Sequence, residues 1–234
     1  MQKKNTPKSI KTPSKNTASK PTLASKSSVT KSATTSKDSA SSISTPSIST
    51  ALESTSLAFF QSLCAHIGEN PTREGLAHTS TRLAQSLLSL LDGYAKSPKD
   101  ALRSTFEDNV CDEMIILKKL HFYSMCEHHI LPFFGHISIG YIPDKKLVGI
   151  SALARLVEVF SHRLQIQENL TAQIADAIYN ELKPKGTMVV CEARHLCLEM
   201  RGQQPQSPII TSALRGLFKK DPRTRAEFMQ LIQN

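Results

Sequence analysis

The chain has 234 residues, of which 39% are hydrophobic, enough for one large domain or two small ones with a packed core. Its net charge of +9 first suggests a nucleic-acid partner. Nine Lys and one Asp in residues 1–50 account for +8 of that charge, so the remainder is almost neutral. A basic balance carried by one terminal segment says little about what the folded part binds, and we expect no nucleic-acid partner.

The five cysteines are odd in number and lack the spacing of a disulfide framework, which predicts a reducing compartment. No apolar run approaches the roughly 18 residues of a membrane-spanning helix, and the N-terminus has no hydrophobic signal core. We therefore expect a cytoplasmic protein without a membrane partner. An organelle transit peptide in residues 1–50 stays an alternative.

Residues 1–50 consist mainly of Ser, Thr, Lys and Ala and contain no aromatic residue. Such a segment cannot bury enough apolar surface to offset the entropy of ordering, so we predict a disordered tail. Besides a transit peptide, it is interpreted as a solubilising or weakly anion-binding extension. The folded part is expected over residues 51–234, with helices in 51–110 and the core in 111–234.

Helical periodicity begins after the tail. Apolar residues recur at three- to five-residue intervals over residues 50–67, and Gly68 supplies a stop. A second helix is capped by Thr79 or Ser80 and ends at Gly93. Both helices are expected to be packing elements without chemistry of their own.

Strands follow at residues 114–123 and 135–141. Cys126–His129 then lies in the connection between them, where a sheet usually presents reactive groups. Two helices are predicted next, one capped by Ser151 and one over Gln167–Leu182.

The last part of the chain favours strands over 187–193 and 195–200 and then one short amphipathic helix, with Phe228 and Leu231 as anchors. Strands, two helices, strands and a terminal helix indicate an α+β protein with mainly antiparallel pairing. Because neither GxxxxGK[ST] nor GxGxxG occurs, any nucleotide must be held by side chains and helix ends.

Thiols and imidazoles gather in the segment Cys126-Glu127-His128-His129. Cys126 and His129, at i and i+3, can meet one metal ion from a tight turn, whereas His128 is expected to point elsewhere. With Cys197 as a third ligand, a zinc tetrahedron keeps its fourth position for water, as catalytic zinc sites do. The alternative is that a lone Cys in a strand is a small buried hydrophobe.

The other cysteines and histidines are interpreted as ordinary residues. Cys64 and Cys191 fall on apolar positions and are expected to pack in the core, while Cys111 lies in a loop beside an acidic residue. The sequence indicates no partner for the single histidines at 66, 78, 121, 136 and 162, and we interpret them as surface or core residues without a catalytic part.

The predicted 195–201 strand has a polar face. Because side chains alternate along a strand, His195, Cys197, Glu199 and Arg201 share one side and the intervening apolar residues face the core. An imidazole, a thiol, a carboxylate and a guanidinium are thus predicted to stand in one row.

Five separated motifs, in this order, resemble the GTP cyclohydrolase I family: FYSMCEHH at 122–129, GIS at 149–151, RLQIQENLT at 163–171, EARHLC at 192–197 and MRG at 200–202. The resemblance extends from about Ala51 to the C-terminus. It implies a tunnelling fold, an antiparallel sheet with two helices on one side, preceded by N-terminal helices. It also implies a toroidal homo-decamer with active sites between neighbouring subunits.

The resemblance further implies hydrolysis of GTP to 7,8-dihydroneopterin triphosphate and formate, the first step of tetrahydrofolate and pterin biosynthesis. By motif position, the zinc ligands would be Cys126, His129 and Cys197. His128 and His195 would move protons, which suits an imidazole with an unperturbed pKa of about 6.5.

The same resemblance implies a substrate site. Gln167 and Glu168 would read the guanine edge. Contacts to the ribose and triphosphate would come from Ser151, which belongs to the catalytic set, and from Arg155 and Arg201, with Arg82 reaching a phosphate from a neighbouring subunit. One departure bears on this site, because Ala152 stands where the family usually carries Lys.

Two other functions remain as alternatives. One is a zinc-bound assembly protein without turnover, in which loss of the cation at position 152 has ended catalysis. The other keeps the fold but acts on another purine nucleotide or makes a related pterin. Assay with GTP and with a substrate panel separates them.

Overall fold

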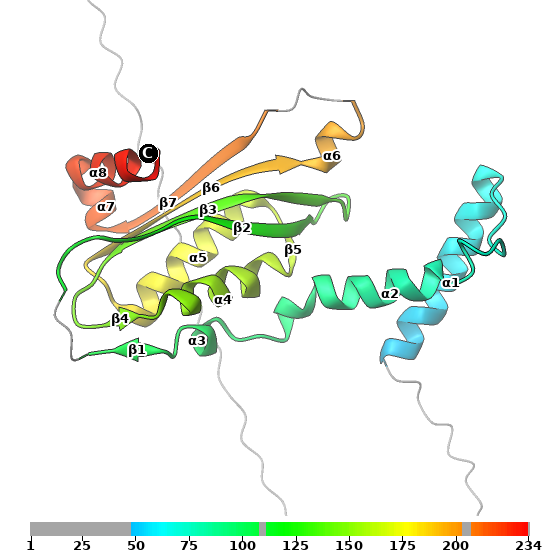
Figure 1. The fold of residues 1–234 in the computed structure, drawn as a ribbon, viewed down its shortest axis with the longest axis horizontal. Helices are drawn as coiled ribbons and strands as arrows, with labels where there is room; N and C mark the ends of the chain where they lie inside the picture. Colours follow the sequence, from blue (N-terminus) through cyan, green and yellow to red (C-terminus); the bar gives the residue numbers. More distant parts are fainter. Residues whose placement is uncertain (1–47, 108–110, 203–206, 234) are drawn as a thin grey trace, which may run out of the picture. The chain divides into compact units, whose positions relative to one another are not determined.

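A five-stranded sheet lies at the centre of the protein, seen in a computed structural model that describes residues 48–107, 111–202 and 207–233 (Figure 1). These described residues group into one compact unit. The strand order is β5-β2-β3-β6-β7, and all neighbours are antiparallel except β2 and β5. The strands are β2 (Ile115–Cys126), β3 (Pro132–Ile142), β5 (Leu164–Gln165), β6 (Gly186–His195) and β7 (Ile209–Gly216). The predicted α+β class with mainly antiparallel pairing is confirmed.

Two helices, α4 (Ile150–Ser161) and α5 (Gln167–Leu182), cover one face of this sheet (Figure 1). Each turns an apolar stripe to the strands, and each fully buried Leu or Ile side chain contributes about 1.5–3 kcal/mol. The resulting core is almost inaccessible to solvent and includes Ile137, Ile139, Leu153, Leu156, Leu170, Ile174, Ile178 and Val189. Helix α4 begins at Ile150 after the N-cap Gly149, so the prediction that Ser151 caps it is wrong.

Part of the opposite face is covered by α7 (Leu217–Lys220) and α8 (Pro222–Gln233). Phe228 is fully buried there, and a Cβ on Gly140 would approach its ring to 2.5 Å, so this glycine makes room for the helix. The prediction that Phe228 anchors this helix is confirmed. The prediction that Leu231 is a second anchor is wrong, because Leu231 is 48% exposed. Ile232, one helical turn after Phe228, is the second anchor.

The N-terminal part forms α1 (Ile48–Ile67), which packs on α2 (Thr79–Leu90), followed by the 3-10 turn η1 (Asp92–Tyr94) and α3 (Pro98–Ala101). A short pairing of β1 (Thr105–Phe106) with β4 (Leu147–Val148) completes the described strands. Gly68 ends α1 with a φ of 76°, as a left-handed C-terminal residue should.

Helix α1 begins at Ile48, so residues 48–50 belong to the helix and not to the predicted tail. The rest of the tail prediction, residues 1–47, lies outside the described residues. Among the described helices, none is long and apolar enough to span a membrane.

The prediction of a strand over residues 195–200 is wrong. Strand β6 ends at His195, and α6 (Leu196–Glu199) follows it directly. The apolar residues of this segment were expected to share one face toward the core, but they do not, since Met200 is 68% exposed. Strand β7 was not predicted at all, and it pairs with β6 along eight residues of register.

Candidate metal centre and active site

The loop between β2 and β3 is held on both sides by backbone hydrogen bonds. Across its mouth the Cys126 N–H donates to the Leu131 carbonyl, and the Ile130 N–H donates to the Cys126 carbonyl, both at 2.9 Å. On the other side, the Glu127 N–H donates to the carbonyl of Gln165 in β5 at 3.0 Å. The two histidines of this loop are therefore carried by a backbone that neighbouring strands keep in place.

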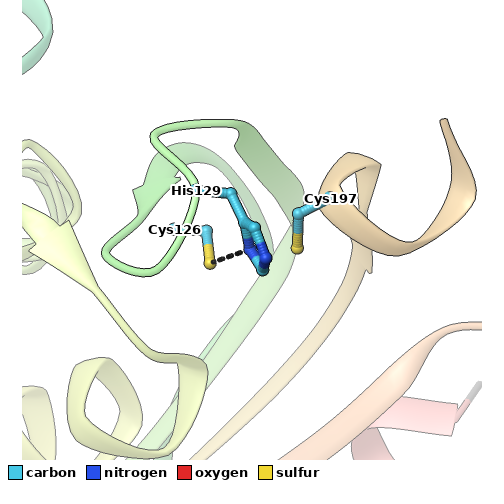
Figure 2. Close-up of side chains that lie close together, drawn as sticks. All are labelled: Cys126, His129 and Cys197. Atoms are coloured by element: carbon cyan, nitrogen blue, oxygen red, sulfur yellow. Dashed lines mark hydrogen bonds between the residues drawn. The ribbon is translucent and has the colours of Figure 1, made fainter. Parts of the chain in front are cut away.

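Cys126, His129 and Cys197 come together as a group that could hold a metal ion, called here the metal group (Figure 2). Their ligand atoms all lie within 4.8 Å of one another, and Cys126 Sγ is 3.8 Å from His129 Nδ1. In a zinc tetrahedron, a sulfur and a nitrogen ligand are separated by about 3.6 Å. Among the described residues, this is the one group of three or more metal-ligating side chains of this geometry, and its two thiols and one imidazole suit zinc.

Cys197 belongs to α6 and extends from there to the group. The sequence had predicted that it would stand on the polar face of a strand. Burial raises the pKa of the Cys197 thiol, and the neighbouring Cys126 thiol raises it further. A buried thiol such as that of Cys197 is stabilised as a thiolate by a nearby cation, which is the chemistry that a metal ion supplies.

A carboxylate and a guanidinium fasten α6 to β6. Arg194 Nε donates to Glu199 Oε1 at 3.0 Å, and its Nη2 donates to Oε2 at 2.6 Å. The bidentate pair spans the turn that carries Cys197 and lowers the pKa of the Glu199 carboxyl.

From the spacing we expected His128 to point away from the thiol of Cys126, but the structure places it beside that thiol. Its Nδ1 lies 3.8 Å from Cys126 Sγ, and its Nε2 lies 3.9 Å from Glu127 Oε1. The side chain is largely exposed and is not part of the three-residue group.

His195, the last residue of β6, lies at the same end of the sheet. Its ring stacks on Phe133 of β3, with centroids 4.8 Å apart and planes 3° from parallel. Its Nε2 lies 2.8 Å from Gln167 Oε1. Burial lowers the pKa of the His195 imidazole, opposed by the charges of Glu168 and Glu199. A partly buried imidazole two residues from a metal-binding thiol is well placed for proton transfer.

The first turn of α5 carries two residues predicted to read guanine, and the structure places them differently. Glu168 is exposed at the helix N-terminus. Gln167 is 1% exposed, and its amide bonds to groups of β6 and β7 and to His195.

The predicted phosphate contacts are spread over the subunit. Arg155 Nη1 donates to Ser151 Oγ at 3.3 Å on α4. At the other end of that helix, the Ser161 carbonyl accepts from Ser124 near the metal group, and ten residues of helix, roughly 15 Å, separate Ser151 from Ser161. Arg82 is exposed on α2.

Arg201 alone among the predicted phosphate-binding arginines touches the metal group, with its Nη1 3.0 Å from His129 Nε2. The Nδ1 of His129 faces Cys126, so Arg201 meets the outward nitrogen of the ring. A cation at the edge of the metal site is suitable for an anionic substrate.

Several partners were missed by the sequence analysis. Phe133 and Thr211 had no signal, because their roles depend on strand pairing. Three of the single histidines have neighbours that the sequence did not indicate. The rings of His121 and His136 lie 4.3 Å apart across two strands, and His162 Nδ1 lies 2.9 Å from Asp92 Oδ1.

The fold and the site together define an α+β protein with a Cys–His–Cys group that could hold a metal ion, beside a partly buried histidine. The sequence profile of GTP cyclohydrolase I matches residues 57–233. The chain belongs to the GTP cyclohydrolase I family of enzymes.

Curated relatives agree with this assignment. GTP cyclohydrolase 1 of Helicobacter hepaticus is 77% identical over 177 residues, 76% of this chain and 86% of that protein. The proteins of the same name from Helicobacter pylori strain G27 and Wolinella succinogenes are 56% and 57% identical, over 75% and 74% of this chain and 98% and 94% of theirs. A solved structure of the archaeosine synthase QueF-Like in the apo form aligns with 46% of this chain and 97% of its own, at a TM-score of 0.38 and 16% identity, too weak a likeness to support an argument.

Proposed function

We propose that the protein is a zinc-dependent GTP cyclohydrolase I, which converts GTP and water to 7,8-dihydroneopterin triphosphate and formate. The observation that carries the proposal is the convergence of Cys126, His129 and Cys197, with His195 held two residues away from the third ligand. Family membership and the names of the relatives support the reaction. The product would enter tetrahydrofolate or other pterin synthesis.

Cys126, His129 and Cys197 would hold the zinc ion. When bound, zinc supplies Lewis acidity that makes a water nucleophilic near neutral pH. The donor set supports this assignment, because soft thiolates with one imidazole favour zinc over hard cations such as magnesium.

The histidines would handle protons. Opening the imidazole ring of guanine requires water to add at C8, after which the ring nitrogen and the departing formyl group need protons. His195 is partly buried, and its ring is held by stacking on Phe133 and by the contact with Gln167, so it would transfer protons in a fixed orientation. His128 is exposed beside the thiol of Cys126 and would exchange protons with solvent.

Substrate recognition would combine a carboxylate with arginines. Glu168, exposed at the start of α5, can accept from both N1–H and the exocyclic amine of guanine, a pair of donors that adenine lacks. Arg201 at the edge of the metal group would contact the triphosphate.

Ser151, Arg155 and Arg82 would complete the site from a neighbouring subunit. The roughly 15 Å of helix between Ser151 and Ser161, whose carbonyl accepts from Ser124 near the Cys–His–Cys group, motivates this proposal, because Ser151 lies well away from that group in its own subunit. From family membership we also propose the tunnelling fold and a homo-decamer, with residues 51–110 and 111–234 as the helical part and the core. Apolar side chains of α1 that one subunit leaves exposed, among them Leu57, Leu63 and Ile67, fit burial between subunits.

The decisive experiment is incubation of the zinc-loaded protein with GTP, with formate and dihydropterin absorbance as readouts. Both products are expected in equal amounts. Stoichiometric zinc without either product at saturating GTP would support the non-catalytic alternative, and turnover of another purine nucleotide in preference to GTP would support the second one.

A further inference from the structure

The amide of Gln167 uses all its polar atoms inside the subunit. Its Nε2 lies 2.9 Å from the carbonyls of both Cys191 and Ile209 and 3.2 Å from Thr211 Oγ1. Its Oε1 lies 2.8 Å from His195 Nε2. Since the side chain is also 1% exposed, its amide is not accessible to a ligand from solvent.

The orientation of this amide follows from its neighbours. Carbonyl oxygens can only accept, so the NH₂ group must face Cys191 and Ile209, and the oxygen must face His195. The amide oxygen in turn can only accept. His195 Nε2 must therefore carry the hydrogen, and the lone pair of the neutral ring is on Nδ1.

Two threonines make the orientation self-consistent. The Thr171 hydroxyl donates to the Gln167 backbone carbonyl at 2.7 Å, which occupies its only hydrogen. The Thr211 hydroxyl, 2.6 Å away, must then donate to Thr171 and can accept from the Gln167 amide. The contacts from Thr211 of β7 through the Gln167 amide to His195 thus agree with a hydrogen on Nε2 of the imidazole.

The ring plane of His195 is fixed as well. Phe133 stacks on it with planes 3° from parallel and is itself fully buried. Rotation of the imidazole would lose both this stacking and the hydrogen bond to Gln167.

We propose that Gln167 is a positioning residue that holds His195 with its hydrogen on Nε2, so that Nδ1 exchanges protons with the substrate. The inference deepens the proposed function and its kinetic part rests on that function. It replaces the guanine-reading role that the family resemblance implies for Gln167 and leaves the exposed Glu168 to that task.

The direct test is the tautomer of His195 in the resting wild-type protein. Protein labelled with ¹⁵N at histidine is sedimented and measured by magic-angle-spinning NMR, and the signals of His195 are assigned by their loss in His195→Gln. In the neutral ring we expect a protonated Nε2 and an unprotonated Nδ1. A protonated Nδ1 would overturn the proposal. No turnover is needed, so this result stands even if the protein fails to convert GTP.

The kinetic test uses Gln167→Met, which keeps an unbranched side chain of similar size. We expect kcat to fall about tenfold or more, because a misoriented proton carrier loses much of its contribution of about 10²–10⁴-fold. KM for GTP and the preference for GTP over ITP, which lacks the exocyclic amine, should not change. A higher KM with a weakened preference would show that Gln167 contacts guanine.

Gln165→Met is the matched control. Gln165 is also buried, but its amide donates to the Phe160 carbonyl and to Gln173, both at 2.9 Å, and the His195 signals should keep their wild-type positions in this variant. If Gln167→Met does not fold, Thr211→Val removes one acceptor and leaves both carbonyls. It should then give a smaller loss of kcat, and an increase in KM alone would contradict the proposal.

Discussion

Arg194 and Glu199 form a bidentate ion pair, at 3.0 and 2.6 Å, that joins the end of β6 to α6 around Cys197. Arg194→Ala should loosen this turn and weaken zinc binding by up to about tenfold, the lower end of the effect of residues that support metal ligands. Zinc affinity is measured by competition with a chromogenic chelator. Arg223→Ala is the control, because it breaks the pair between Arg223 of α8 and Asp221 just before that helix, away from the site, and should leave the affinity unchanged.

Cys197→Ser should abolish stoichiometric zinc binding, since the hydroxyl is a far poorer ligand than a thiolate. Elemental analysis after dialysis against a low concentration of zinc gives the metal content. Cys191→Ala removes another buried thiol, outside the metal group, and should retain one zinc per subunit. A Cys197→Ser protein with one zinc per subunit would remove Cys197 from the ligand set.

Thiol reactivity should differ sharply between two cysteines. Burial raises the pKa of Cys191 to about 12, so its thiol stays protonated at pH 8 and should resist alkylation in the folded protein. Cys111 is partly exposed and should react first. Iodoacetamide labelling with peptide mass spectrometry measures both rates, and equal rates in the native protein would contradict the buried placement of Cys191.

Asp92 should contribute to stability at neutral pH but not in strong acid. Hydrogen bonds from Lys96 and then His162 hold its pKa below the usual 3.8. Because the folded pKa is lowered, this stability is present above about pH 4 and is lost as the pH falls through the folded pKa. Asp92→Asn should therefore destabilise the protein in urea at pH 6 and much less at pH 2.5.

A double-mutant cycle checks the cause. Lys96→Met should also destabilise at pH 6, and adding it to Asp92→Asn should cost less than the sum of the two single changes. Additive effects would show that the ion pair is not the source of the pH dependence.

Lys183 offers a route to higher stability. It ends α5 in the left-handed conformation, with a φ of 51°, which costs an L-residue about 1 kcal/mol. Lys183→Gly should raise the free energy of unfolding by roughly 0.5–1 kcal/mol, measured by urea denaturation. Lys183→Ala, which keeps the Cβ, should give no such gain, and a gain as large as that of glycine would point to charge instead of backbone strain.

Local sequence patterns predicted much of the fold. Helices α4 and α5 and strands β2 and β3 follow from apolar spacing, which reports the face that each element buries. The candidate metal ligands were predicted from side-chain chemistry, because two thiols and an imidazole have few other uses in such a cluster, and the structure brings the three side chains together.

The neighbours of these residues were decided by tertiary structure. Residues 196–200 alternate apolar and polar as a strand would, yet they turn into α6, since β6 loses its pairing partner at His195 and the Arg194–Glu199 pair closes the turn. Strand β7 escaped detection because its side chains gain their partners only by pairing with β6.

At the candidate site, too, the residues were predicted from the sequence, whereas their contacts depend on the tertiary structure. The sequence predicted His195 and Gln167 as site residues, since both stand in motifs that resemble the family. It could not show that the buried amide faces the imidazole and not the substrate. That contact depends on Cys191, Ile209 and Thr211, which lie 24 to 44 residues from Gln167 along the chain and meet it only when β6 and β7 pack against the start of α5.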